Sequence, residues 1–349
     1  MKILYFGFYN PEYSRNRVLI KGLRQNGLEV TECRVDYKSI WSYSVLFFKY
    51  LSFRHDFDIM IVGFPGQEVM FMARILTRQP IVFDAFTSHY EGYIQDRALY
   101  EVNSLRAKFY RWLDYNSCRL ADIVLLDTNA HIDYFVKEFG LPKEKFRRIF
   151  VGADSSLFYP PSKENINDKF KVHFHGHYIP LQGIEYIIRA ANILKNEDIR
   201  FVLIGRGQTY TCNRKLADDL DIKNIEFVGA VSYQELADRI RTADICLGIF
   251  GHTAKAQRVI PNKLFEAIAC AKPVITARSP AIAELLTDGE NVILCNAADP
   301  EDLAKKILDI KNNKAIADFV GSNGLNLFKN KLETNTLGEE LKDIIDEIL

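Results

Sequence analysis

The stretch "KVHFHGHYIPLQGIEYIIRAANILKNEDIRFVLIG" (171–205) contains the pattern that decides the fold class. It begins and ends with a short, mostly apolar segment of the kind that forms strands. Between these segments, apolar residues recur at the spacing of an amphipathic helix, at Ile184, Ile187, Ile188, Ala191 and Leu194. A strand, a helix and a second strand in this order form a βαβ unit, so we predict an α/β fold.

Similar units recur along the whole chain. Several apolar runs, such as 58–64 and 121–127, lack polar alternation, which is typical of parallel strands covered on both faces. A chain of 349 residues is also too long for one ordinary core. We therefore predict two Rossmann-like, doubly wound domains facing a cleft. Pro160, Pro161 and the polar segment around them (154–170) indicate the boundary. The predicted parts are a first domain (1–160), a second domain (161–330) and a C-terminal helix (331–349) that could cross back to the first domain.

The composition excludes some partners. Lys+Arg and Asp+Glu both number 45, so no global field attracts nucleic acid, and we expect no nucleic-acid partner. The six cysteines show no Cys-x-x-Cys spacing, which is typical of reduced thiols. The first residues lack the pattern of a signal peptide, and no segment has about 20 consecutive apolar residues. We therefore expect a cytoplasmic protein.

Three of the seven histidines lie close together, at 173, 175 and 177. In a strand, His173 and His175 point to the same face, where they could ligate a metal. No Asp, Glu or Cys stands nearby at ligand spacing, whereas a tetrahedral site needs three or four ligands. The loop after His175 runs from a strand end to a helix start near Gly183, which is where a phosphate is expected. We therefore predict a phosphate-binding loop and no metal.

Two further segments could contact a ligand. In "PNKLFEAIACAKPVIT" (261–276), a helix begins near Asn262, and its first N–H groups could bind an anion. The alternative is an ordinary helix start in which Glu266 is a capping or surface residue. In "LIGRGQTY" (203–210), a Gly-x-Gly turn follows a strand, but Tyr210 stands where a dinucleotide-binding motif has its third glycine. That segment therefore predicts a tight turn.

In this order, the segments resemble the retaining glycosyltransferases of family four (glycosyl transferases group 1), which have the GT-B fold. The resemblance covers most of residues 150–310 and rests on "VGAD" (151–154), loop 176–183, "LIGRGQ" (203–208), "IEFVGAVSYQEL" (225–236), "ADICLGIF" (243–250) and 261–307. It implies transfer of a hexosyl or related group from a nucleotide-diphosphate sugar of the UDP or GDP type, with retained configuration and without a metal or other cofactor. It also implies a glycan or lipid-linked glycan acceptor seated on the first domain, in the synthesis of cell-envelope polysaccharide or glycolipid.

The resemblance also implies roles for individual residues. Glu266 matches the glutamate that hydrogen-bonds the ribose, and residues 229–231 match the loop that holds the base. The donor-binding residues expected in this way are His177, Gln182, Gly183, Gly205, Gly207, Gly229, Ala230, Val231, Lys255, Asn262, Leu264 and Glu266.

The chain departs from the family pattern where charge is needed. Arg258 stands where the family usually has Glu, and His177 and Gln182 stand where it often has Arg and Lys. A leaving diphosphate needs cationic or N–H partners. We expect Lys255, Arg258 and Lys263 to supply this charge, with Arg258 and Lys263 as catalytic residues. Two alternatives stay open, a non-catalytic nucleotide-sugar-binding homologue and a nucleotide-sugar epimerase on the same fold.

Candidate acceptor residues lie in the first domain. Asn10, Ser14 and Arg15 follow the first predicted strand, although Ser14 could simply cap the next helix. Asp84 and His89 lie in "FDAFTSHYEG" (83–92), and the resemblance suggests that they hold the transferred sugar or the acceptor. The alternative for Asp84 is a structural carboxylate.

One predicted helix could contact a membrane. In "WSYSVLFFKYLSFRH" (41–55), Trp41, Val45, Phe48 and Ser52 share a stripe. The alternative is a helix that packs on the sheet. Peripheral contact with the inner face of a membrane is therefore left open.

Overall fold

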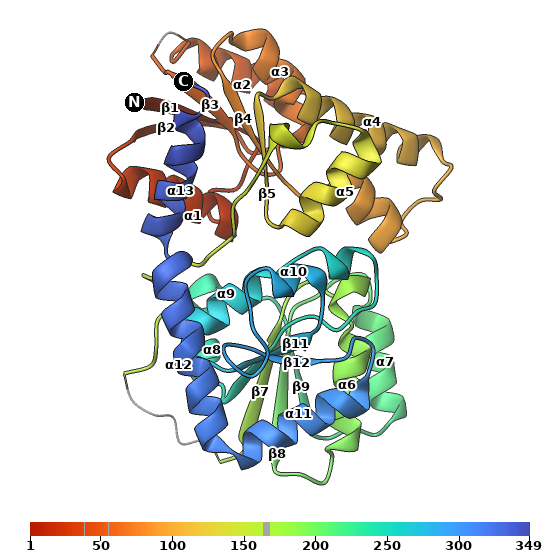
Figure 1. Cartoon of the computed structure of the whole chain (residues 1–349). Coiled ribbons are helices and arrows are strands. Elements are labelled where there is room, and N and C mark those ends of the chain that lie inside the picture. The colour runs from red at the N-terminus through yellow and green to blue at the C-terminus, as the bar shows by residue number, and fades with distance from the viewer. Residues whose placement is uncertain (38, 55, 163–167) are drawn as a thin grey trace. The chain divides into compact units, whose positions relative to one another are not determined.

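The computed structural model describes residues 1–37, 39–54, 56–162 and 168–349. The chain folds into two compact units, each a parallel six-stranded sheet with flanking helices (Figure 1). The prediction of two Rossmann-like domains is thus confirmed. The two units consist of Met1–Gly152 with Leu332–Leu349, and of Ala153–Lys331.

The domain boundary differs from the predicted one. The first unit ends at Gly152, earlier than Pro160, because Ala153 and Phe158 already belong to the second unit and are buried. Residues 163–167, within the predicted linker, lie outside the described residues.

The first unit contains a sheet in the order β2-β1-β3-β4-β5-β6. The described strands pair in parallel, in keeping with runs that are buried on both faces. The strands are β1 (Lys2–Gly7), β2 (Glu29–Arg34), β3 (Ile59–Val62), β4 (Ile81–Phe86), β5 (Ile123–Leu126) and β6 (Phe146–Arg148). The helices are α1 (Ser14–Gln25), α2 (Trp41–Leu51), α3 (Met70–Leu76), α4 (Leu105–Leu120), α5 (Asn129–Phe139), α13 (Thr334–Asp346) and the short η1 (Gln67–Val69), η2 (Glu91–Asp96) and η3 (Lys143–Lys145).

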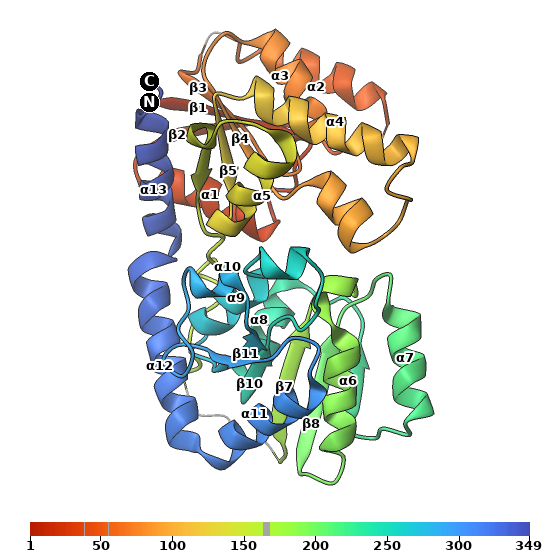
Figure 2. The same ribbon diagram turned by 45° about the vertical axis from the view of Figure 1, so that its right-hand side comes forward.

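The C-terminal helix α13 packs on α1 within the first unit (Figure 2). Two glycines allow the close approach. A Cβ on Gly22 would lie 2.3 Å from the carbonyl oxygen of Thr334, and a Cβ on Gly338 would lie 2.2 Å from the carbonyl carbon of Gly22. A larger residue at either position would push the helices apart. The last helix is therefore part of the first unit.

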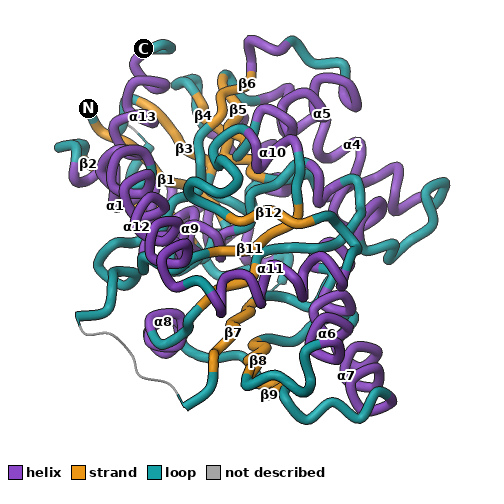
Figure 3. The backbone as a smooth tube through the Cα atoms, turned by 60° about the horizontal axis from the view of Figure 1, so that its bottom comes forward, coloured by secondary structure: helices purple, strands orange, loops and turns teal. Residues whose placement is uncertain are grey.

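The second unit contains a sheet in the order β12-β11-β10-β7-β8-β9, again with parallel pairs (Figure 3). Its strands are β7 (Phe170–His175), β8 (Ile199–Ile204), β9 (Ile225–Val228), β10 (Ile245–Leu247), β11 (Val274–Ala277) and β12 (Ile293–Cys295). Its helices are α6 (Ile184–Ile193), α7 (Tyr210–Asp219), α8 (Tyr233–Arg241), α9 (Asn262–Ala269), α10 (Pro280–Ala283), α11 (Pro300–Asn312), α12 (Lys314–Lys331) and the short η4 (Pro180–Gln182) and η5 (Lys255–Gln257).

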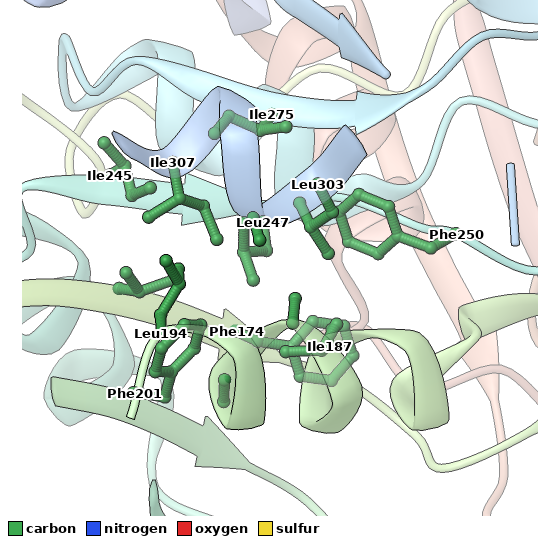
Figure 4. Close-up of a cluster of buried hydrophobic side chains, with 14 of the residues drawn as sticks. Phe174, Ile187, Leu194, Phe201, Ile245, Leu247, Phe250, Ile275, Leu303 and Ile307 are labelled. Atoms are coloured by element: carbon green, nitrogen blue, oxygen red, sulfur yellow. The ribbon is translucent and has the colours of Figure 1, made fainter. Parts of the chain in front are cut away.

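The core of the second unit lies between its sheet and helices α6 and α11 (Figure 4). Ile187 of α6 and Leu303 of α11 pack there against Phe174 and Leu247 of the strands. Because side chains alternate along a strand, His173 and His175 point to the opposite face from Phe174. The histidines therefore lie outside this core.

The strand order locates the site. In the second sheet, β8 and β9 follow on one side of β7, whereas β10, β11 and β12 lie on its other side. The chain thus changes direction between β7 and β10, and ligands of doubly wound sheets bind outside the carboxyl ends of the strands at such a point. The residues that follow His175 and Leu247 are therefore the first place to look for a donor site.

Candidate functional site

The loop after β7 is held closely against two neighbouring loops. Gly183 has φ +63°, and a Cβ there would lie 2.4 Å from the backbone nitrogen of Gly251. The Gly-x-Gly turn after β8 supports the same loop, since a Cβ on Gly205 would lie 2.0 Å from the carbonyl oxygen of Gly176. Gly207 approaches the backbone of Tyr178 to a similar degree. These glycines therefore permit close backbone packing, as the tight-turn interpretation predicts.

A buried lysine from α9 lies beside this loop. Helix α9 begins at Asn262 with Pro261 as its N-cap residue, as the sequence predicts. The Nζ atom of Lys263 donates a hydrogen bond to Oε1 of Gln182 and lies 3.5 Å from the carbonyl oxygen of Gly248. It also lies 3.8 Å from the centre of the Phe174 ring. The lysine thus brings its amine to the gap between the ends of β7 and β10.

No carboxylate is paired with the amine of Lys263 among the described residues. Its side chain is 5% exposed, and it forms no ion pair with the described residues. Burial lowers the pKa of Lys263 well below its ordinary value, and the more distant Glu266 only opposes this shift. A buried lysine whose pKa is perturbed in this way is a candidate functional residue.

The predicted ribose-binding glutamate is joined to the two strand histidines. Nε2 of His173 lies 2.9 Å from Nδ1 of His175, and Nε2 of His175 lies 2.7 Å from Oε2 of Glu266. The other carboxylate oxygen, Oε1, lies 3.4 Å from the hydroxyl of Tyr233. Glu266 is therefore buried, at 2% exposure, and is not the surface residue of the alternative interpretation.

The sequence did not reveal this arrangement. The absence of an acidic residue near His173 and His175 in the chain suggested that no carboxylate accompanies them. Glu266 is 91 residues away from His175 in the sequence, yet it is hydrogen-bonded to it. Among the described residues, no group of three or more His, Cys, Asp or Glu side chains has the geometry to hold a metal ion.

The remaining donor-side candidates are more exposed. His177 is exposed, and Lys255 and Arg258 are half-buried in the segment just before α9. After β9, Gly229 and Val231 are half-buried and Ala230 is exposed. Leu264 is buried, so only its backbone could contact a ligand.

In the first unit, Arg15 and Asp84 form a fully buried ion pair. Nε of Arg15 lies 2.7 Å from Oδ1 and 2.9 Å from Oδ2 of Asp84, and Nη1 donates to the carbonyl oxygen of Ile149 at 2.9 Å. Both side chains are 0% exposed. Neither side chain is exposed to an acceptor in this structure, and this burial favours the structural alternative for Asp84. Ser14 is buried as the first residue of α1, and Tyr13, not Ser14, occupies the N-cap position.

The other two acceptor-side candidates differ in exposure, since Asn10 is exposed and His89 is buried. Asn10 is exposed, and its Oδ1 accepts from the backbone N–H of Glu12 at 2.9 Å. His89 is 7% exposed, and its Nδ1 lies 3.6 Å from Oε1 of Glu68. Its backbone N–H donates to Oδ1 of Asp114 at 3.1 Å, which holds the segment after β4 in place.

The first unit contains a second buried charge cluster, formed by His131, Asp127 and Glu91, which the sequence analysis did not predict. His131 lies between Asp127, 2.7 Å from Nδ1, and Glu91, 2.8 Å from Nε2. Burial alone would lower the pKa of His131, but the two carboxylates outweigh it and raise the pKa to about 9. The i, i+4 spacing of Asp127 and His131 was a usable signal for one contact, whereas no sequence signal indicated Glu91.

The second unit matches a known family. Residues 169–313 match the family model described as glycosyl transferases group 1. An uncharacterized glycosyltransferase of Methanocaldococcus jannaschii is 28% identical over 183 residues, which are 50% of this chain and 46% of the relative. A GDP-mannose-dependent monoacylated alpha-(1-6)-phosphatidylinositol monomannoside mannosyltransferase of Corynebacterium glutamicum is 22% identical over 218 residues, 57% of this chain and 56% of the relative. The matched part of the chain thus spans about half the length of these curated relatives.

A solved structure extends the likeness in fold. The crystal structure of Anabaena HepE in complex with UDP and glucose superposes with a TM-score of 0.75, covering 99% of this chain and 100% of that one, at 16% identity. At this identity the likeness concerns the fold alone. The likeness to glycosyl transferases group 1 thus concerns residues 169–313, and the likeness of the whole chain concerns the fold.

Proposed function

We propose that the protein is a retaining, metal-independent glycosyltransferase that takes its sugar from a nucleotide-diphosphate donor. The donor would bind at the carboxyl ends of β7 and β10. Its diphosphate would meet the side-chain amine of Lys263 and the backbone N–H groups of the first turn of α9. The bond between the sugar and the leaving phosphate oxygen would break as the acceptor oxygen bonds to the same face of the sugar. The acceptor proton would pass to the leaving phosphate. A GDP-mannose-dependent relative and a structural neighbour solved with UDP and glucose support a nucleotide-sugar donor.

The observation that carries this proposal is the buried amine of Lys263. It lies at the topological switch point of the sheet and close to a helix N-terminus, where anions are favoured. Its hydrogen bond to Gln182 also explains a departure from the family pattern. Gln182 stands where the family often has a lysine, and the amine of Lys263 reaches that position from another element. In this proposal, Lys263 takes the place of that lysine and becomes positively charged when the diphosphate binds.

Arg258 and Lys255 would complete this cationic clamp. Both lie in the segment that leads into α9, and both are half-buried. Cationic groups beside the developing diphosphate charge stabilise the transition state more than the ground state. Replacement Arg258→Ala should therefore weaken donor binding and slow turnover. Unchanged affinity and rate in this variant would remove Arg258 from the clamp.

We also propose that the first unit contacts a membrane, consistent with a lipid-linked acceptor. Helix α2 buries Leu46 and Tyr50 but leaves Trp41 74% and Phe48 67% exposed. Helix α2 can therefore pack on the sheet with one side and contact a membrane with the other. No helix in the described ranges is long and apolar enough to cross a bilayer. Contact would have to be peripheral.

The neighbouring helices continue this surface. Helices α2, α3 and α4 are neighbours in the first unit (Figures 1 and 2). The hydroxyl of Tyr50 donates to the carbonyl oxygen of Leu76 at 2.8 Å, which ties α2 to α3, and Phe71 of α3 stacks on Trp112 of α4. Asp114 is the acidic residue of these three helices and is buried. Their basic residues are Lys49, Arg74, Arg106, Lys108, Arg111 and Arg119. We call this surface of α2, α3 and α4 the basic aromatic face, and it is suited to anionic lipid.

Thermal unfolding with UDP, GDP or ADP, each with and without EDTA, tests the donor site. A ligand at a hundred times its dissociation constant adds about 2.7 kcal/mol of stability, which shifts the unfolding midpoint visibly. We expect a shift with one nucleotide that survives EDTA. A shift that disappears on chelation would contradict metal independence, and no shift with any nucleotide would contradict the donor site.

Product analysis then separates the alternative functions. A transferase needs an acceptor and yields free nucleoside diphosphate, whereas an epimerase converts the donor to a new sugar nucleotide without an acceptor. A non-catalytic homologue binds nucleotide and releases nothing. Incubation of the donor whose nucleotide binds, with and without a lipid extract as acceptor source, distinguishes these three outcomes by chromatography of the nucleotides.

A further inference from the structure

We propose that His175, held in turn by His173, positions the carboxylate of Glu266 so that its Oε1 atom accepts a hydroxyl group of the donor ribose. This inference rests on the proposed function, because it concerns the same donor site. It assigns a role to the two strand histidines, which neither the family resemblance nor the proposed chemistry uses. Both would be positioning residues, since neither needs to touch the donor.

The contacts among His173, His175 and Glu266 show which atom donates in each hydrogen bond. A carboxylate only accepts, so Nε2 of His175 carries a hydrogen and donates to Oε2 of Glu266 at 2.7 Å. Burial, His175 and the cations around it lower the pKa of His173 well below its ordinary value, so His173 is neutral. A neutral His173 that donates from Nε2 meets the lone pair on Nδ1 of His175 at 2.9 Å. Each histidine thus has one fixed tautomer.

Burial, and after it the basic groups around His173, disfavour a proton on His173. Lys171 of the same strand, Arg239 of α8 and Lys263 of α9 all disfavour a proton on His173. With Lys171 and Arg239, His173 also lines a cavity of about 270 Å³. A proton on His173 would therefore face the cations Lys171 and Arg239, and a neutral His173 avoids this repulsion.

The two carboxylate oxygens of Glu266 are held unequally. Oε2 makes the short contact with His175, whereas Oε1 lies 3.4 Å from the Tyr233 hydroxyl, a length at which a hydrogen bond is weak. Because Glu266 is buried, a ribose hydroxyl would reach Oε1 by taking the place of the Tyr233 hydroxyl. Fixing Oε2 thus leaves Oε1 correctly aimed before the donor arrives, which reduces the cost of ordering on binding.

Binding measurements with matched nucleotides test the inference. The probes are UDP, GDP and ADP, and the 2′,3′-dideoxy form of whichever binds, measured by calorimetry on the full chain. In the wild type, loss of the ribose hydroxyls should weaken binding roughly tenfold, the effect of one hydrogen bond to a charged group. In His175→Ala this difference should fall to roughly threefold or less, because Glu266 is no longer held. Affinity for inorganic diphosphate should not change, since the clamp is intact.

A conservative variant separates positioning from folding. The side-chain amide of Gln places an N–H donor near the position of the histidine Nε2 atom, so His175→Gln should restore the ribose discrimination. His173→Gln should likewise keep it, by donating to Nδ1 of His175. Thermal unfolding of each variant shows whether it is folded. If His175 had only a structural role, His175→Ala would weaken the binding of all probes by the same factor. The ratio of affinities for the ribose and dideoxy nucleotides would then stay at its wild-type value, and His175→Gln would have nothing to restore in it.

The outcomes are distinguishable from those of the proposed function. If the wild type binds none of the three nucleotides, the donor site and this inference are both wrong. If the wild type prefers the ribose form and folded His175→Ala keeps the same preference, the positioning role is overturned while the donor site stands. If His175→Gln discriminates as poorly as His175→Ala, donation to Glu266 is not the cause and the inference is also overturned.

Discussion

Two buried basic groups of the first unit and Lys263 of the second unit have partners of different kinds. In the first unit, each buried cation that we describe faces carboxylates, Arg15 at Asp84 and His131 between Glu91 and Asp127. In the second unit, the buried amine of Lys263 meets an amide oxygen, a carbonyl oxygen and an aromatic ring. A buried charge without a counterion is costly in a folded protein. The difference supports two proposals: that the clusters of the first unit serve stability, and that Lys263 meets an anion of the ligand.

The largest expected effect is on the stability of the first unit. Replacement Asp84→Ala removes the partner of a fully buried guanidinium and should lower the free energy of unfolding by about 3–5 kcal/mol. Chemical denaturation of both proteins measures this difference. Asp133→Ala, which breaks an exposed ion pair with Lys143, is the control and should leave the unfolding midpoint unchanged. A similar midpoint in both variants would mean that the buried pair contributes no more than a surface one.

The second expected effect is a pH dependence caused by His131. Its pKa is raised from 6.5 to about 9 on folding, so its contribution to stability is complete below pH 6.5 and disappears as the pH rises through 9. The whole contribution amounts to about 3 kcal/mol. In His131→Gln the titrating group is absent, so the stability gap between wild type and variant should narrow from pH 6 to pH 9. A gap that is constant with pH would show that folding does not change the pKa of this imidazole.

The third effect concerns ligand binding and not stability. Lys263→Met replaces a buried amine by an apolar chain of similar length, which should leave stability unchanged or raise it. Affinity for the nucleoside diphosphate should fall by about 1.5–3 kcal/mol, the value of a hydrogen bond to a charged group. Calorimetry with UDP, GDP and ADP measures this loss.

A half-buried lysine, Lys272, provides the control for Lys263. Burial also lowers the pKa of Lys272, but Lys272 precedes β11 and so lies at the amino edge of the sheet. Lys272→Met should therefore bind nucleotide as the wild type does. Equal losses in both variants would place the diphosphate away from Lys263.

The wild type should also take up a proton on binding, because the phosphate raises the lowered pKa of Lys263, and calorimetry in buffers of different ionisation enthalpy detects this uptake.

How much the sequence could predict depends on how far apart the interacting residues lie. The strands and helices follow from local patterns, and the start of α9 at Asn262 and the tight turn at Gly205 were predicted from neighbouring residues. The contacts of His175 with Glu266 and of Arg15 with Asp84 join residues 91 and 69 positions apart. Such contacts depend on which strands become neighbours, and spacing along the chain does not specify this. The charge at Lys263 was predicted, but its hydrogen bond to Gln182 was not.

The smallest expected effect extends the comparison to the surfaces of the two units. The basic aromatic face of the first unit joins exposed apolar side chains such as Phe48 to lysines and arginines on α4. A single Lys near an anionic membrane contributes about 1 kcal/mol. Lys108→Gln should therefore weaken binding to vesicles of phosphatidylcholine and phosphatidylglycerol about fivefold, as measured by co-sedimentation, and have no effect with phosphatidylcholine alone.

A lysine of the second unit is the matched control for this prediction. Lys305 is exposed on α11, a helix whose inner side packs on the core of that unit. If attraction comes from the basic aromatic face, Lys305→Gln should bind the anionic vesicles as the wild type does. Equal weakening in both variants would instead indicate a nonspecific attraction by net charge, since each change removes one positive charge from a chain whose formal net charge is zero. A wild type that does not sediment with anionic vesicles would contradict the membrane contact altogether, and Phe48 would then need another partner to explain its exposure.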